Sequence, residues 1–155
     1  VFVTVGIALW LTVLALHQPL PGPSFAVPEW LRFIGLLGFI LSIVAFFEGA
    51  TFSSLDGLLG VPGGHMSHSH GDETPLLTEG AYGRVRHPMY RAALFAGLCS
   101  VLIHGNVAAL FWAVLVGATF ILFIPIEEQQ LVAARGTAYL DYRERTPYRL
   151  LRGIW

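Results

Sequence analysis

The feature that most constrains the fold is a set of four long apolar runs separated by polar stretches. The runs cover residues 1–16, 30–47, 88–103 and 107–126. Each approaches the roughly 20 apolar residues that a helix needs to cross a bilayer. Only 12% of the chain is charged, whereas soluble domains average roughly 25%. We therefore expect an all-α membrane protein, a bundle of four transmembrane helices forming a single membrane domain over residues 1–155.

The first run is short for a span, but it lacks the basic leader and the cleavage site of a signal peptide. We interpret residues 1–16 as a true span that is cut at its N-terminal end. The proline-rich segment 17–29 predicts a loop. The polar stretch 48–87 predicts a longer loop, within which residues 52–59 are compatible with a short interfacial helix.

The last two runs are predicted to be antiparallel neighbours. His104, Gly105 and Asn106 separate them and are typical of a tight turn. The run 107–126 is predicted to end at Glu127 and Glu128, and an amphipathic helical tail is expected over residues 127–155.

The distribution of charge predicts the orientation. All nine basic residues are arginines, and only Arg32 lies at the far end of the predicted bundle. The others fall on or just inside the side of the loop and the tail: Arg84, Arg86, Arg91, Arg135, Arg143, Arg145, Arg149 and Arg152. The positive-inside rule makes that side cytoplasmic, as in a bacterial inner membrane. The net charge of −1 gives no field that would attract nucleic acid.

Polar residues gather on this same side in two blocks. The first is GAYGRVRHPMYR, residues 80–91, and the second is Glu127-Glu128 followed by residues 139–145. The antiparallel hairpin would bring His87 close to the two glutamates. The start of the third helix offers free N–H groups that favour an anionic ligand group, and the glutamates can accept hydrogen bonds or pair with a cation. The two blocks together predict a site for a zwitterionic or mixed-charge ligand at the membrane surface.

Most of these residues also have a simpler interpretation. Arginines that flank a span usually anchor its topology, and Pro88 fits the first turn of any helix. Tyrosines at this depth can form an aromatic belt: Tyr82, Tyr90, Tyr139 and Tyr142. Two adjacent glutamates at the end of an apolar run are less ordinary, because acids in a membrane are costly and tend to be functional. The combination of both blocks therefore favours a functional site.

The two blocks and their spacing resemble a known family. The pattern G-x-Y-x-x-x-R-H-P-x-Y, a two-span hairpin, E-E-x-x-L, a segment A-x-x-G-x-x-Y-x-x-Y-R and a final proline cover residues 76–150, about half of the chain. It is similar to the isoprenylcysteine carboxyl methyltransferase and phospholipid methyltransferase superfamily of membrane enzymes. One departure is Ala92, where many relatives carry glycine, preceded by the bulky Arg91.

The resemblance implies S-adenosylmethionine as methyl donor, bound at the cytosolic face. The reaction it implies is an in-line displacement, which needs positioning and desolvation more than an acid or a base. The acceptor is lipid-like or a small hydrophobic molecule: a prenylcysteine carboxylate, a phospholipid amine or a small thiol. Carried over to this chain, the cofactor contacts are Tyr82, Arg86, His87, Pro88, Tyr90, Glu127 and Glu128. The residues expected to hold the acceptor or close the site are Arg143 and Arg145.

Two other functions compete with this one. The first is a non-catalytic membrane subunit that packs against partner helices, to which small residues at helical spacing point: Gly35, Gly38, Ala93 and Gly97. The second is a nicotinamide-dependent membrane reductase, because the family also includes sterol reductases and a fold does not settle a reaction.

The histidine-rich segment is a separate question. His65, His68 and His70 lie within six residues, and neutral imidazoles can bind zinc, copper or nickel. The resemblance implies no metal, and we favour a polar loop over a metal site. Cys99 is the single cysteine, so the chain has neither an internal disulfide nor a cysteine-based metal site.

Overall fold

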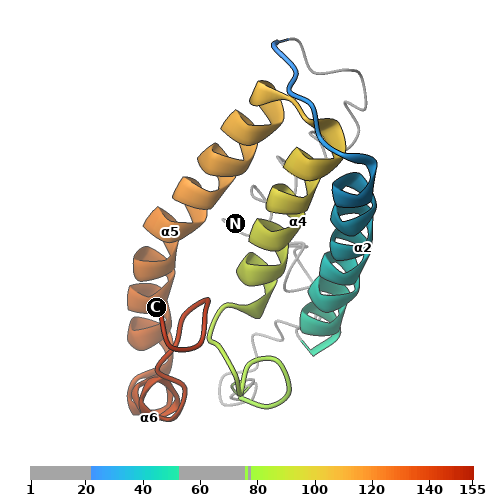
Figure 1. Ribbon diagram of the computed structural model, residues 1–155. Coiled ribbons are helices and arrows are strands. Elements are labelled where there is room, and N and C mark those ends of the chain that lie inside the picture. Colours follow the sequence, from blue (N-terminus) through green and yellow to red (C-terminus); the bar gives the residue numbers. More distant parts are fainter. Residues whose placement is uncertain (1–21, 53–75, 77) are drawn as a thin grey trace, which may run out of the picture.

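The computed structural model describes residues 22–52, 76 and 78–155, and the regular secondary structure in these ranges consists of helices, with no β-strand in them. The helices are α2 (Glu29–Phe52), α4 (Pro88–His104), α5 (Val107–Arg135) and α6 (Thr137–Arg145). Figure 1 shows α2, α4 and α5 side by side, with α4 in the middle, and the short α6 at one end. The prediction of an all-α fold is confirmed for the described residues.

The α2–α4 contact depends on small residues. A Cβ atom built on Gly35 would lie 2.9 Å from Leu102 Cβ and 3.1 Å from the carbonyl oxygen of Cys99. A Cβ on Gly38 would lie 2.7 Å from the Cys99 sulfur. Real Cβ atoms come this close to other heavy atoms seldom or never, so glycine at these positions lets the two helix backbones approach. Two of the small residues that suggested a partner helix, Gly35 and Gly38, thus pack α2 against α4 within the chain, and a third, Gly97, faces Ala113 of α5.

The turn between α4 and α5 is closed by Gly105 and Asn106, as predicted. Gly105 ends α4 with φ +58°, a left-handed conformation that favours glycine. The side chain of Asn106 caps α5 by accepting a hydrogen bond from the Ala108 N–H at 2.6 Å. The segment before α2 closes over this turn, because the N–H of Phe25 donates to the Gly105 carbonyl at 2.7 Å. The end of the molecule opposite α6 is therefore held by backbone hydrogen bonds.

Two predicted boundaries are wrong. The predicted loop 48–87 begins too early, because α2 continues to Phe52. The fourth run does not end at the glutamates, because α5 continues through Pro125, Glu127 and Glu128 to Arg135. Good helix formers occupy this stretch, and the buried Glu128 carboxylate is paired, so neither propensity nor charge ends the helix there. Of the predicted tail, only Thr137–Arg145 forms a separate helix.

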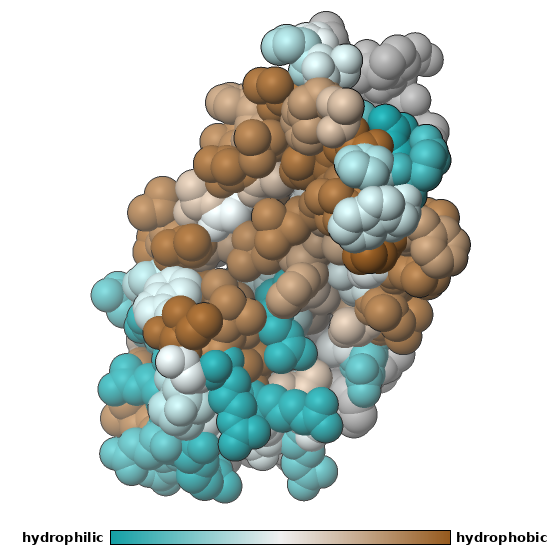
Figure 2. Space-filling model, in the orientation of Figure 1, coloured by the Kyte–Doolittle hydropathy of each residue, from teal (hydrophilic) through white to brown (hydrophobic). Residues whose placement is uncertain are grey.

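The membrane prediction is supported for part of the chain. By length and composition, α2 and α5 could each cross a bilayer, whereas α4 is a shorter apolar helix of 17 residues. Residues 1–16 lie outside the described ranges, and so do all of residues 52–59 except Phe52. Of the four predicted spans, the described residues therefore contain two candidate spans and the shorter helix α4. Figure 2 shows apolar residues along the helices and hydrophilic residues gathered at the end where α6 lies. Large apolar side chains point outward from both long helices, for example Leu41 and Leu122.

We predict that Gly35→Ala destabilises the protein by up to about 2 kcal/mol. The overpacking cost of about 1–3 kcal/mol exceeds the helix-propensity gain of about 1 kcal/mol, because a backbone oxygen cannot move aside. Thermal unfolding of purified protein in detergent measures the effect. Gly49→Ala is the matched control on the same helix, since its Cβ would meet mainly the flexible side chain of Met89, at 3.0 Å. An equal loss in both variants would contradict the close-packing explanation.

Candidate functional site

The site centres on the carboxylate of Glu128, on α5. Its side chain is only 4% exposed, and three cationic or potentially cationic groups surround it. Oε1 accepts a hydrogen bond from Arg86 Nε at 2.7 Å and lies 3.3 Å from His87 Nε2. Oε2 accepts from Arg149 Nε at 3.1 Å and Nη2 at 2.9 Å. A buried carboxylate is stable only with such partners, so Glu128 ties α5 to two other segments.

Arg86 connects the start of α4 to the C-terminal segment, residues 146–155. Its side chain is 5% exposed, and Nη1 donates to the carbonyl oxygens of Thr146 and Pro147 at 2.8 and 2.9 Å. Two backbone bonds run alongside, since the N–H groups of Arg86 and His87 donate to the carbonyls of Tyr148 and Arg149, both at 2.9 Å. The flat fork of the Arg86 guanidinium bonds the Glu128 carboxylate and both carbonyl oxygens at once. A lysine ammonium does not have this fixed fork geometry.

The second glutamate faces the aromatic rings of α4. Tyr90 donates its hydroxyl hydrogen bond to Glu127 Oε2 at 2.7 Å, and His87 Nδ1 lies 3.7 Å from the same oxygen. The His87 ring stacks on Tyr90, and Tyr90 stacks on Phe120 of α5, with ring centroids 5.4 and 4.7 Å apart. The Glu127 side chain is 28% exposed, so this carboxylate is accessible where that of Glu128 is not.

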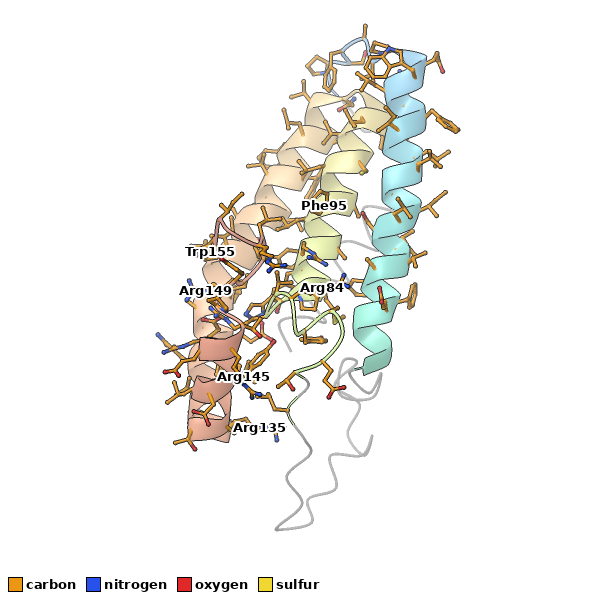
Figure 3. The ribbon with its side chains drawn as sticks, turned by 60° about the horizontal axis from the view of Figure 1, so that its bottom comes forward. Arg84, Phe95, Arg135, Arg145, Arg149 and Trp155 are labelled. Atoms are coloured by element: carbon orange, nitrogen blue, oxygen red, sulfur yellow. The ribbon has the colours of Figure 1, made fainter. Side chains whose placement is uncertain are left out.

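The C-terminal segment covers the space between α4 and α5, which splay apart toward this end in Figure 1. Leu150 packs in the core beside Tyr90 and Phe120, and Trp155 packs against the same cluster. The guanidinium of Arg149 lies over the Trp155 ring, 5.0 Å from its centroid, and Figure 3 shows these two side chains next to each other. The segment thus places an apolar cover and a cation over the Glu128 carboxylate.

The helix α6 contributes two buried tyrosines, Tyr139 and Tyr142, which lie on one face because they are three residues apart. The hydroxyl of Tyr142 donates to the Tyr82 carbonyl at 2.8 Å and so holds the turn before α4. The Tyr139 side chain lies beside the charged cluster. Burial raises its pKa to about 12, and the nearby carboxylates of Glu128 and Glu127 add to the shift. Both phenols are therefore protonated donors at neutral pH.

The structure brings together most of the residues that the sequence indicated. His87, Glu127 and Glu128 meet as expected, although about forty positions separate them. Arg86 and Tyr90 join them, the Tyr82 carbonyl is bonded to Tyr142 of α6, and Pro88 occupies the first turn of α4. The chemical roles assigned to these residues stay predictions.

Other candidates lie elsewhere. Arg143 and Arg145 are exposed on α6, where Arg145 Nε donates to the Asp141 carbonyl at 3.4 Å, and their role stays a prediction. The histidines His65, His68 and His70 lie outside the described residues. Within the described part of the chain, no group of three His, Cys, Asp or Glu side chains is arranged to hold a metal ion.

Sequence reasoning missed Arg149 as a member of the site. It was counted only among the arginines that orient the chain, whereas the structure pairs it with Glu128. The helical tail was expected to run to residue 155, although Pro147, two positions before Arg149, is a signal that the helix ends and the chain can turn back. Nothing in the local sequence showed that the turn would bring Arg149 to α5.

We predict that Arg86→Lys loosens the C-terminal segment. A lysine keeps the charge but loses at least one of the carbonyl bonds, which costs about 1.5–3 kcal/mol for a charged donor. Hydrogen exchange of residues 146–155 and the unfolding temperature measure the effect. Arg84→Lys, the same change at an exposed residue two positions earlier, should leave both unchanged. Unaltered exchange in Arg86→Lys would show that the segment is held by other contacts.

Comparison with known proteins finds sequences similar to this chain. A protein-S-isoprenylcysteine O-methyltransferase B of Arabidopsis thaliana is 36% identical over 73 residues, which are 46% of this chain and 37% of that protein. The chain thus matches little more than a third of that relative's length. No solved structure matches the chain at a significant level. The sequence profile described as phospholipid methyltransferase matches residues 31–135, more than half of the chain, including Arg86, Tyr90 and both glutamates. The chain therefore belongs to the phospholipid methyltransferase family.

Proposed function

We propose that this protein is a membrane-embedded methyltransferase that uses S-adenosylmethionine. The observation that carries the proposal is the buried network in which Glu128 joins Arg86, His87 and Arg149 beside the accessible Glu127. Such a network lies at the end of apolar helices, where uncompensated charge is costly. All of these residues except Arg149 lie inside the region matched by the methyltransferase family, which supports a role in binding rather than in anchoring alone.

The residues present fit the proposed cofactor. S-adenosylmethionine carries a carboxylate, an ammonium and ribose hydroxyls, and when bound it supplies a methyl group on a sulfonium sulfur. Glu127 offers an accessible carboxylate for a cation or a hydroxyl. The N-terminus of α4, beside His87 and Arg86, favours an anionic group. A buried hydroxyl, that of Tyr139, also has no partner among the described residues and is available to a ligand.

The protein's own contribution in this proposal is positioning and exclusion of water. His87, Tyr90 and Phe120 form a stacked wall, and Tyr90 holds the Glu127 carboxylate in one orientation. Leu150 and Trp155 cover the space between the helices. Methyl transfer to a reactive acceptor needs alignment in a dry site more than it needs a general acid or base.

The proposed acceptor is a lipid-like or small hydrophobic molecule that reaches the site from the bilayer. The names of the family and of the relative suggest two forms, a phospholipid amine and a prenylcysteine carboxylate, and a small thiol remains a third. The apolar outer surfaces of α2 and α5 support contact with lipid. The exposed Arg143 and Arg145 are proposed to hold an anionic part of such an acceptor.

The site is proposed to face the cytoplasm. Every arginine of the described residues except Arg32 lies at the site end of the helices or in the segments that follow them. Basic residues accumulate on the cytoplasmic side of membrane proteins.

We predict that the purified protein binds S-adenosylhomocysteine, the demethylated product, and that Glu127→Gln and His87→Ala weaken binding at least tenfold. Loss of a charged or hydrogen-bonded contact of about 1.5–3 kcal/mol corresponds to that factor. Calorimetry in detergent measures the affinity. Glu144→Gln, the same change at an exposed glutamate of α6, should bind as the wild type does.

Two outcomes separate this proposal from the others. No saturable binding by the wild type, with the nicotinamide cofactor bound instead, would favour a membrane reductase. No binding of either cofactor would favour a non-catalytic subunit.

A second prediction concerns the acceptor. If Arg143 and Arg145 hold an anionic acceptor, alanine at either position should raise KM for a prenylcysteine acceptor about two- to fivefold, the effect of an exposed ion pair. The affinity for S-adenosylhomocysteine should not change. Transfer of labelled methyl groups to a prenylcysteine analogue and to phospholipid vesicles measures this. Arg152→Ala, also exposed, is the control, and an equal KM in all variants would remove both arginines from the acceptor site.

A further inference from the structure

The hydroxyl of Tyr139 is in an unusual environment for a folded protein without a ligand. The residue is only 2% exposed, and its hydroxyl has no hydrogen-bond partner among the described residues. Nearly all buried polar groups in native proteins are hydrogen-bonded, and one that is not calls for an explanation. Tyr139 is the single such side chain found in the described part of the chain.

The surroundings of Tyr139 are the proposed cofactor site. Its charged neighbours include Glu128, Arg86 and Glu127, the residues at the centre of that site. These groups already bond to one another, Glu128 with Arg86 and Arg149, and Glu127 with Tyr90. The polar groups of the cluster thus have hydrogen-bond partners without Tyr139. The phenol of Tyr139 is left as a donor that has no acceptor among the described residues.

The next tyrosine on the same face shows what a structural role looks like. Tyr142 is equally buried, and its ring centroid lies 5.8 Å from that of Tyr139. Its hydroxyl, however, donates to the Tyr82 carbonyl at 2.8 Å. A buried hydroxyl that stabilises the fold is hydrogen-bonded in this way. The hydroxyl of Tyr139 makes no such bond among the described residues, so it does not have this structural role.

We propose that Tyr139 is a cofactor-binding residue whose hydroxyl donates a hydrogen bond to an acceptor atom, an oxygen or a ring nitrogen, of bound S-adenosylmethionine. The inference rests on the proposed function and adds one residue to its site. The apolar ring of Tyr139 packs in the protein with or without the ligand, whereas its hydroxyl gains a partner only when the ligand is present. The hydroxyl therefore favours the bound state without being needed for folding.

The test removes only the oxygen atom. Tyr139→Phe should leave the unfolding temperature of the ligand-free protein unchanged or raise it, because an unsatisfied buried hydroxyl contributes nothing favourable to the fold. The same variant should bind S-adenosylhomocysteine about tenfold more weakly, the effect of one lost hydrogen bond in a buried site. The added ligand should accordingly raise its unfolding temperature less than it raises that of the wild type.

Tyr142→Phe is the matched control, and it should lower the unfolding temperature of the ligand-free protein because it breaks a hydrogen bond within the protein. If Tyr139→Phe is destabilised in the same way, its hydroxyl has a partner in the free protein and the inference is overturned. Wild-type affinity in Tyr139→Phe overturns it as well, while leaving the proposed function intact. Absence of binding by the wild type overturns both.

Discussion

The burial of one carboxylate at the end of an apolar helix is the constraint on which the rest of this structure depends. Glu128 is 4% exposed, and a charge in that position is tolerated only when other groups replace the lost water. Those groups come from the start of α4 and from the segment after α6. Because Arg86 also bonds the carbonyls of Thr146 and Pro147, satisfying the carboxylate folds the C-terminal segment onto the helices.

Different interactions hold the two ends of the helix bundle. At the α4–α5 turn, glycine and backbone hydrogen bonds hold the chain, and the close contact of α2 with α4 requires Gly35. At the other end, α4 and α5 diverge, and stacked rings together with Leu150 occupy the space between them. A tightly packed end beside a wider, polar end suits a protein that holds its ligand at one membrane surface.

Several features were predictable because they are local. Pro88 predicted the start of α4, and the short turn at Gly105 and Asn106 implied antiparallel helices. From that hairpin, the meeting of His87 with Glu127 and Glu128 followed. The end of α5 was not predictable in the same way, because nothing in the local sequence shows that a glutamate after the apolar run is buried and paired. In this protein Glu128 has buried partners, and the helix continues for another turn and more to Arg135.

The sequence by itself determined the helical class, the apolar surfaces and the identity of the two polar blocks, since hydropathy and helix-terminal signals act over a few neighbouring residues. Only the tertiary structure decided which of the C-terminal arginines enters the site. Arg143, Arg145 and Arg149 look alike along the chain, yet the turn after Pro147 brings Arg149 to Glu128 and leaves the other two exposed. It also decided that Tyr142 is bonded and Tyr139 is not. Such differences depend on long-range contacts, which no local pattern of residues encodes.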